Sequence, residues 1–306
     1  MKRFILNTVL FLLFASIFYI VVLNLWGYYL PQSLKPNINY RIGSYGHMYS
    51  RLSEVKNYGE VDILFLGSSH TYRGFDTRIF AEKGYKTFNL GSSSQTPIQT
   101  KVLLHRYLDR LNPKLVIFEV YPEAFSLDGV EASLDIIAND KNDFQSIKMA
   151  FIINNVKTYN TLIYGLTREL LGLNSPLIED TIKRADKYVS GGFVEREMGF
   201  YQPEKIEEKE IVFQDYQLKA FSEIVEKFEE KGIELILVYA PIPRPTYERY
   251  TNAKYFDSVM QGYATYYNFN EMISLNDSLH FYDSHHLNQN GVEIFNEKII
   301  ELIESR

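Results

Sequence analysis

The feature that most constrains the fold of this chain is a set of short, almost wholly apolar runs separated by helical patterns. The runs lie at 61–67 (VDILFLG), 85–91 (YKTFNLG), 114–122 (KLVIFEVYP) and 233–241 (IELILVYAP), and a shorter one lies at 264–272 (ATYYNFNEM). Short segments that are apolar on both faces are typical of strands buried in a parallel sheet. The runs are therefore interpreted as the strands of such a sheet, the last as its shortest strand.

Between these runs, apolar residues recur at helical spacing. The pattern predicts helices over 97–111, with a proline at an early helical position, over 214–231, ending at Gly232, and over 289–305. Strands separated by helices form a parallel sheet with helices on both faces. The 306 residues, 46% of them hydrophobic, suffice to bury such a core. We therefore predict a three-layer α/β/α fold with a mostly parallel sheet.

Small and polar residues stand where the predicted strands end. They are Gly67-Ser68-Ser69, Gly91-Ser92, Glu119 to Tyr121, and Tyr239 to Pro241. Ligands of parallel sheets bind at the carboxyl ends of the strands, so this edge is the predicted site. Taken alone, the two serines also suit a polar strand-to-helix turn in which a hydroxyl caps the next helix.

The N-terminus carries a second strong signal. Residues 4–30 contain no charged side chain, and this stretch exceeds the about 20 residues that a membrane-spanning helix needs. Lys2 and Arg3 precede it, and Trp26, Tyr28 and Tyr29 lie near its far end, as expected of an aromatic belt. We predict a single-pass anchor in the cell membrane with a cytoplasmic N-terminus and an extracytoplasmic body. A cleaved signal peptide is the alternative, but its apolar region is normally shorter.

These signals divide the chain into three parts. Residues 1–30 are the predicted transmembrane anchor, 31–60 a membrane-proximal linker, and 61–306 one extracytoplasmic domain. That domain carries an insertion at about 124–213 with helical patches at 144–156 and 159–171 and a Gly-Gly pair at Gly191. The insertion is longer than a crossover requires, and we interpret it either as a cap beside the site or as a purely structural excursion.

Composition excludes several classes of function. The net charge of −6 offers nothing to a nucleic-acid backbone, so no nucleic acid is expected as a partner. The chain has no cysteine, which excludes disulfides, thiolate zinc sites and cysteine nucleophiles. No G-x-G-x-x-G follows a strand and no P-loop is present, which argues against nucleotide binding.

Half of the histidines of the chain lie in one segment, HFYDSHHLNQNGVEIFN, just before the last predicted helix. Asp283 and His286 are three residues apart there, so the carboxylate can orient the imidazole within one loop. Such a histidine needs a hydroxyl to deprotonate, and Ser69 at the end of the first strand can supply it. Serine, histidine and aspartate in these places predict a catalytic triad for nucleophilic attack.

A metal site is the alternative interpretation of this segment. His280, Asp283, His285 and His286 are all chemically suitable zinc ligands. Four candidates within seven residues rarely close a tetrahedron, so we predict no metal, and His285 is expected to be a turn residue.

The motifs FLGSSHTYRGFD and FYDSHHLNQNG together resemble the SGNH/GDSL hydrolase superfamily. More narrowly, they resemble its membrane-anchored bacterial branch, which includes the teichoic-acid D-alanyl-transfer protein DltD and the alginate O-acetyltransferases. The resemblance extends from about residue 61 to the C-terminus. It implies that Ser69 is the nucleophile, that Asp283-Ser-His-His286 supplies the acid and the base, and that the oxyanion hole is formed by the Ser69 and Gly91 amides.

One departure from the family pattern is evident. The superfamily's third motif usually contains an asparagine that donates to the oxyanion, whereas VIFEVYPEAF contains none. Losing one such donor costs a hydrolase on the order of a hundredfold in rate. Glu119 and Tyr121 occupy that region, and together with His70 and His285 they are the expected pocket residues.

The resemblance implies serine-dependent ester hydrolysis or acyl transfer on cell-envelope or exported polysaccharide, without a cofactor. The missing asparagine shifts the expectation from esterase toward O-acyltransferase, for which a membrane-bound acyl-donor protein would be a partner. A catalytically silent module that binds polymer or organises an envelope assembly is the alternative.

Overall fold

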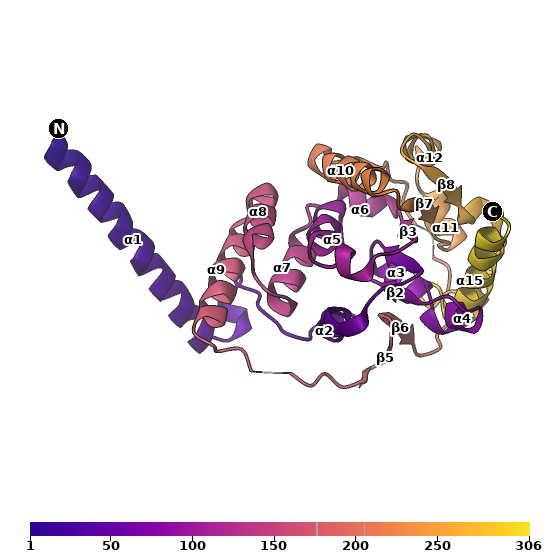
Figure 1. Ribbon diagram of the computed structural model, residues 1–306, viewed down its shortest axis with the longest axis horizontal. Helices are drawn as coiled ribbons and strands as arrows, with labels where there is room; N and C mark the ends of the chain where they lie inside the picture. Colours follow the sequence, from indigo (N-terminus) through magenta and orange to yellow (C-terminus); the bar gives the residue numbers. More distant parts are fainter. Residues whose placement is uncertain (176, 205) are drawn as a thin grey trace.

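A five-stranded parallel sheet forms the centre of the molecule (Figure 1). The computed structural model describes residues 1–175, 177–204 and 206–306. The strands are β1 (Ile63–Leu66), β2 (Thr87–Asn89), β3 (Leu115–Glu119), β7 (Glu234–Tyr239) and β8 (Thr265–Asn268), in the order β2-β1-β3-β7-β8. Every neighbouring pair is parallel. The predicted fold class is confirmed.

Helices cover both faces of this sheet. Alternate residues of a strand point to opposite faces: Leu64 and Leu66 belong to one apolar core, and Ile63 and Phe65 to the other. The first core is covered mainly by α2 (Met48–Tyr58), α5 (Pro97–Leu111) and α10 (Asp215–Lys231), and the second by α4 (Thr77–Glu82) and α15 (Gln289–Glu304). The fold therefore has three layers.

The predicted helices end where their capping residues place them. Helix α5 has the predicted bounds, and Thr96 and Gln99 form a capping box at its start. Helix α10 ends at Gly232, which adopts φ 64°, and α15 begins after Asn288, whose side chain accepts the N–H of Gly291. Four short helices complete the C-terminal half: α11 (Arg244–Glu248), α12 (Ala253–Gln261), α13 (Phe269–Met272) and α14 (Asp277–His280).

The segment 31–60, predicted as a linker, contains a short 3₁₀ helix (Gln32–Leu34) and helix α2. Met48, Leu52 and Val55 lie on one face of α2 and are buried in the core beside the sheet. This burial makes the second half of the segment part of the α/β domain.

The insertion at 124–213 consists of helices followed by a small sheet. Its helices are α6 (Pro122–Ser126), α7 (Val130–Asn139), α8 (Phe144–Ile153) and α9 (Val156–Leu170), and its strands are β4 (Ile182–Lys183), β5 (Asp186–Val189) and β6 (Phe193–Arg196). Helices α8 and α9 correspond to the helical patches predicted at 144–156 and 159–171. The break between the two helices lies a few residues earlier than predicted, because Asn154 adopts a left-handed conformation and Asn155 caps α9. The three strands form an antiparallel sheet that the sequence did not predict.

Helix α1 (Lys2–Tyr29) extends away from the domain, and α9 lies beside its C-terminal end (Figure 1). In the part of the chain that the structure describes, α1 is the one helix long and apolar enough to cross a membrane. By length and composition it suits either a membrane span or a signal sequence.

Candidate active site

The turn from β1 into α3 (Ser69–Gly74) presents Ser69 at the carboxyl edge of the sheet. Gly67 adopts φ +136°, a conformation that disfavours other residues. A Cβ at this position would lie 2.6 Å from the carbonyl oxygen of Glu119 on β3. Glycine is therefore required at the end of β1.

The structure brings Ser69, His286 and Asp283 together in one hydrogen-bonded chain. His286 Nε2 lies 2.8 Å from Ser69 Oγ, although the two residues are 217 positions apart. His286 Nδ1 lies 3.0 Å from each carboxylate oxygen of Asp283. Because Nδ1–H is donated to the carboxylate, Nε2 is the ring nitrogen that can accept the Ser69 proton.

Asp283 also fixes the loop that carries the histidine. Its Oδ1 accepts the backbone N–H groups of His285 and His286, each at 2.8 Å. Burial alone would raise the pKa of Asp283, but the hydrogen bond and charge of His286 and these two amides lower that pKa well below its usual range. Asp283 is therefore a stable anion beside the imidazole.

Two aromatic rings enclose the ring of His286. Tyr282 stacks on it at 5.4 Å between centroids with a 6° interplanar angle, and His70 lies at 4.9 Å with 25°. Arg73 of α3 and Arg196 of β6 contact the Tyr282 ring. Both guanidinium groups bind Asp186 of β5, at 2.9 and 3.0 Å. The small sheet of the insertion therefore supports the histidine through Tyr282.

Ser68 belongs to a second polar chain beneath the first. Its Oγ lies 3.1 Å from His70 Nδ1 and 3.2 Å from Glu119 Oε2. The same oxygen accepts the backbone N–H of His70 as the N-cap of α3. The capping role considered for the two serines thus falls to Ser68, while Ser69 faces His286.

Burial controls the charges of this second chain. It raises the pKa of Glu119 to about 8, despite hydrogen bonds from Ser68 and Thr71 that oppose the shift. Burial, followed by the charges of His286 and His285, lowers the pKa of His70 well below its ordinary value. At neutral pH, Glu119 is mostly protonated and His70 is neutral.

A cavity of about 130 Å³ opens beside the Ser69 hydroxyl. It is lined by Ser68, Ser69, His70, Ser94, Gln95, Tyr121, Glu123, Ala124, Leu127, His285 and His286. Of the predicted pocket residues, His70, Tyr121 and His285 line it, whereas Glu119 is buried beneath it. His285 is more than a turn residue, because its Nδ1 lies 3.2 Å from the Tyr121 hydroxyl.

The predicted oxyanion role of Gly91 does not fit this geometry. The Gly91 N–H is donated to Asn89 Oδ1 at 3.0 Å, and Asn89 Nδ2 donates in turn to the Thr71 carbonyl at 2.7 Å. A Cβ at Gly91 would lie 2.7 Å from the Ser68 carbonyl oxygen. Gly91 is therefore small because the backbone of the nucleophile turn passes beside it, and its amide already has an acceptor.

Several residues of the site were absent from the sequence prediction. The sequence indicates only that Asn89 belongs to a strand, and it gives no separate signal for Tyr282, Arg73 or Asp186. Tyr282 directly precedes Asp283, so its position next to the predicted triad was the one available indication.

The alternative metal site does not form around the histidine segment. His280 Nδ1 accepts the backbone N–H of Asn276 at 2.8 Å and lies in α14, which packs on α15. Within residues 1–175, 177–204 and 206–306, no group of three or more His, Asp or Glu side chains is close enough to hold a metal ion.

No family model matches the chain, and no curated protein matches it. Among solved structures it is similar to a candidate acylhydrolase of Bacteroides fragilis, with 14% sequence identity, 86% of this chain and 98% of that chain covered, and a TM-score of 0.42. It is also similar to a GDSL-like lipase of Bacteroides thetaiotaomicron, with 14% identity, coverage of 86% and 99%, and a TM-score of 0.41. At this similarity, what the site can do rests on its own geometry.

Proposed function

We propose that this protein is a serine-dependent acyl-transfer or ester-hydrolysing enzyme of the SGNH type. The observation that carries the proposal is the continuous chain from Ser69 Oγ through His286 to Asp283, with contacts of 2.8 and 3.0 Å at the rim of a cavity. A hydroxyl, an imidazole of defined tautomer and an ionised carboxylate in this order are what nucleophilic attack on an ester requires.

In the proposed reaction, Ser69 Oγ attacks the acyl carbon while His286 Nε2 takes the hydroxyl proton. The tetrahedral intermediate collapses, the alcohol leaves with that proton, and the acyl group remains as an ester of Ser69. Water or a sugar hydroxyl then attacks this ester, with His286 again accepting and returning the proton. Asp283 keeps the imidazole oriented and stabilises its charge throughout.

Stabilisation of the oxyanion falls to the Ser69 amide at the start of α3. With the Gly91 N–H bound to Asn89 and no asparagine in the third motif, the site has fewer donors than a typical hydrolase of this superfamily. Each missing donor costs about 2.7–4 kcal/mol of transition-state stabilisation. This supports a slow or acceptor-dependent enzyme rather than a fast general esterase.

The size of the cavity supports a short acyl group. About 130 Å³ is close to an engineered protein cavity that holds benzene, so an acetyl-sized group fits. The imidazole and phenol groups at the rim, from His285 and Tyr121, are suitable hydrogen-bond partners for a hydroxylated acceptor.

The proposed location is the outer face of the cell membrane, with α1 as a single-pass anchor and Lys2 and Arg3 on the cytoplasmic side. Cell-envelope or exported polysaccharide is then the proposed acceptor, and a membrane-bound acyl-donor protein the proposed partner. This assigns the chain to the membrane-anchored branch that it resembles, the one that includes DltD and the alginate O-acetyltransferases.

Turnover of p-nitrophenyl acetate by the full-length protein in detergent, with and without acetylatable oligosaccharides, tests the proposal. We expect slow release of nitrophenol that depends on Ser69, and acetylated oligosaccharide among the products. Water used freely while acceptors stay unmodified would leave an esterase. Ser68→Ala is the comparison variant, since it removes the neighbouring hydroxyl, which caps α3, and keeps both Ser69 and His286.

A catalytically silent polymer-binding module is the second candidate, favoured by the occupied Gly91 amide. It predicts no nitrophenol release above that of Ser69→Ala, together with binding of oligosaccharide at the cavity. A Ser69-dependent rate excludes it.

A further inference from the structure

Helix α9 packs against the C-terminal half of α1. The Tyr19 hydroxyl donates to Asn160 Oδ1 at 2.5 Å, and Asn24 Nδ2 donates to Thr167 Oγ1 at 3.2 Å. Beyond Asn24 on α1, the ring of Tyr164 lies so close to Gly27 that a Cβ there would be 2.5 Å from it. The two helices therefore cross, and the first of these contacts joins Tyr19 to the first half of α9.

The Tyr19–Asn160 contact places the first half of α9 at the level of the apolar part of α1. Val156 lies one turn before Asn160, which is about 6 Å along a helix. If α1 crosses a membrane from Phe4, the about 20 residues that span the hydrocarbon core extend to roughly residue 24. The corner between α8 and α9 would then lie below the membrane surface.

The side chains at this corner suit such a position. Phe151 is 69% exposed, Ile152 42% and Val156 59%. Large apolar side chains gathered on the surface of a soluble domain mark a contact with a partner or a membrane. Here they gather at the depth that the anchor assigns to the hydrocarbon.

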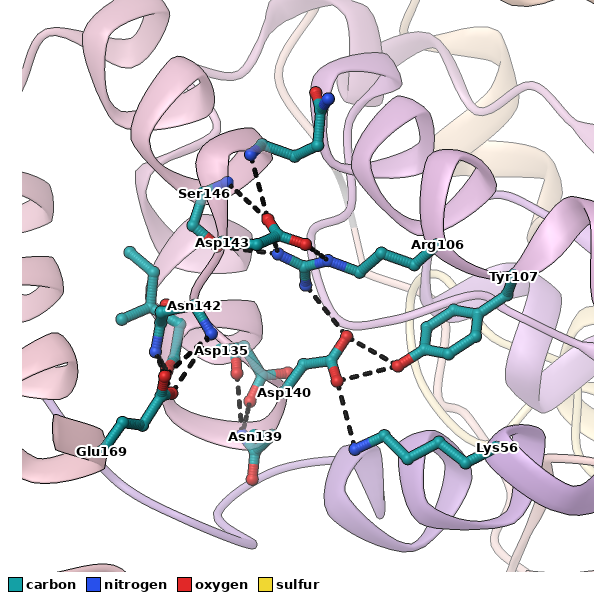
Figure 2. A network of polar contacts seen from close by, with 12 residues as sticks. Lys56, Arg106, Tyr107, Asp135, Asn139, Asp140, Asn142, Asp143, Ser146 and Glu169 are labelled. Carbon is teal, nitrogen blue, oxygen red and sulfur yellow. Dashed lines mark hydrogen bonds and ion pairs between the residues drawn. The ribbon is translucent and has the colours of Figure 1, made fainter. Parts of the chain in front are cut away.

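Polar contacts hold the ends of α8 and α9 that lie opposite this corner to the domain (Figure 2). Buried Arg106 of α5 binds Asp140 and Asp143, which lie before α8, at 2.9 and 2.8 Å. Glu169 of α9 accepts from Asn142 at 2.6 Å. Because α8 and α9 are fixed to the core at one end and to α1 along one side, the apolar corner cannot turn away from the bilayer.

Lysines of α5, α8 and α10 lie around one cavity that Ile152 of the corner also lines. Lys148 lies one turn before Ile152, and both line a cavity of about 400 Å³ with Lys101 and Lys219. Burial and the charges of Lys148 and Lys219 lower the pKa of Lys101, and Glu223, which also lines the cavity, pairs with the Lys101 ammonium. Lysine side chains on apolar surfaces reach outward to headgroups, and anionic lipids attract them.

We propose that the α8–α9 corner, formed by Phe151, Ile152 and Val156, enters the same bilayer as α1 and is a second membrane contact of the domain. The partner is the lipid bilayer itself, with anionic headgroups around Lys148. The proposal rests on the anchoring role proposed for α1. It gives the α8–α9 part of the insertion a role, which is to set the orientation of the domain on the membrane.

Single-cysteine labelling tests this directly, because the chain has no cysteine of its own. Phe151→Cys carries an environment-sensitive fluorophore in the full-length protein reconstituted into vesicles that contain phosphatidylglycerol, with or without lipids brominated on their acyl chains. The same label on Leu10→Cys reports on the anchor, on Phe144→Cys it reports on the opposite end of α8, and on Glu297→Cys it reports on the exposed face of α15. We expect brominated lipids to quench the fluorescence strongly at positions 10 and 151 and only weakly at positions 144 and 297.

The outcomes separate the two claims. Quenching at position 10 without quenching at 151 overturns the membrane contact and leaves the anchor intact. No quenching at position 10 contradicts the anchor and the contact together. Equal quenching at 151 and 144 also overturns the proposal, since it would mean that α8 lies flat on the bilayer rather than entering it by its corner.

Discussion

Ser68 and Ser69 are consecutive, yet their hydroxyls belong to chains of opposite character. Ser69 faces a histidine and an aspartate at the rim of a cavity, where the pKa of Asp283 is lowered. Ser68 faces a histidine and a glutamate in the interior, where burial raises the pKa of Glu119 to about 8. The same three types of side chain thus occur twice within a few ångströms.

The environment of the carboxyl group distinguishes the reactive chain of Ser69 from the structural chain of Ser68. Asp283 receives two backbone amides and a histidine, so its charge persists and polarises the imidazole. Glu119 has no cation beside it among its described contacts, and as a neutral acid it only holds Ser68 and the nucleophile turn in place. The motif that carries Asp283 and His286 is visible in the sequence, whereas the neutral state of Glu119 is not, because it depends on burial.

Removing the Ser69 hydroxyl is the strongest test of whether the two serines have different roles. Ser69→Ala is expected to lower nitrophenyl ester turnover by roughly a millionfold, since removal of the nucleophile has this effect in other serine hydrolases. Steady-state kinetics on both serine variants measure it. A larger loss in Ser68→Ala than in Ser69→Ala would reverse the two roles.

Asp283→Asn is expected to have the next largest effect. The amide cannot stabilise a charged imidazole and favours the wrong tautomer, which in a comparable triad costs about ten-thousandfold in kcat. The loss should appear in kcat with KM nearly unchanged. An activity within a few-fold of wild type would remove Asp283 from the proposed mechanism.

Tyr282→Ala tests the support behind the histidine. Stacked aromatic pairs contribute about 0.5–1.5 kcal/mol, so we expect kcat to fall by roughly two- to tenfold. Tyr282→Phe keeps the ring and should restore the wild-type rate. If the phenylalanine variant is as slow as the alanine variant, the hydroxyl and not the stacked ring is what matters.

Glu119→Gln should change stability with pH more than activity. A glutamate in the unfolded chain titrates near ~4.3, and Glu119 in the folded protein near about 8. Between these values the folded state binds the extra proton, so this group makes the protein less stable as pH rises toward 8. The variant should match wild type near pH 5 and be more stable at pH 8 in chemical unfolding. Identical pH profiles would mean that Glu119 is ionised when folded.

The sequence predicted the fold class, the five strands and helix α5 because apolar periodicity and capping residues are local signals. The pairing of Ser69 with His286 was accessible as well, since both residues follow from the carboxyl-edge rule and a short motif. Helix α2 had a readable signal in Met48, Leu52 and Val55, but the glycines and prolines around it favoured a linker.

Other features were not readable from the sequence. The occupied amide of Gly91 and the neutral state of Glu119 depend on distances and burial that arise only when β1, β2 and β3 align. The β4–β6 sheet has short strands with charged residues, and its ion pair with α3, between Arg73 and Asp186, spans more than a hundred positions.

The most direct test of the central claim is to map the adduct of a fluorophosphonate probe on the full-length protein by tandem mass spectrometry. The expected result is a phosphonyl group on Ser69 in the peptide that also contains Ser68, lost in Ser69→Ala and strongly reduced in Asp283→Asn. An adduct on Ser68, or an unlabelled protein beside a fully labelled reference serine hydrolase, would contradict the assignment of the reactive chain.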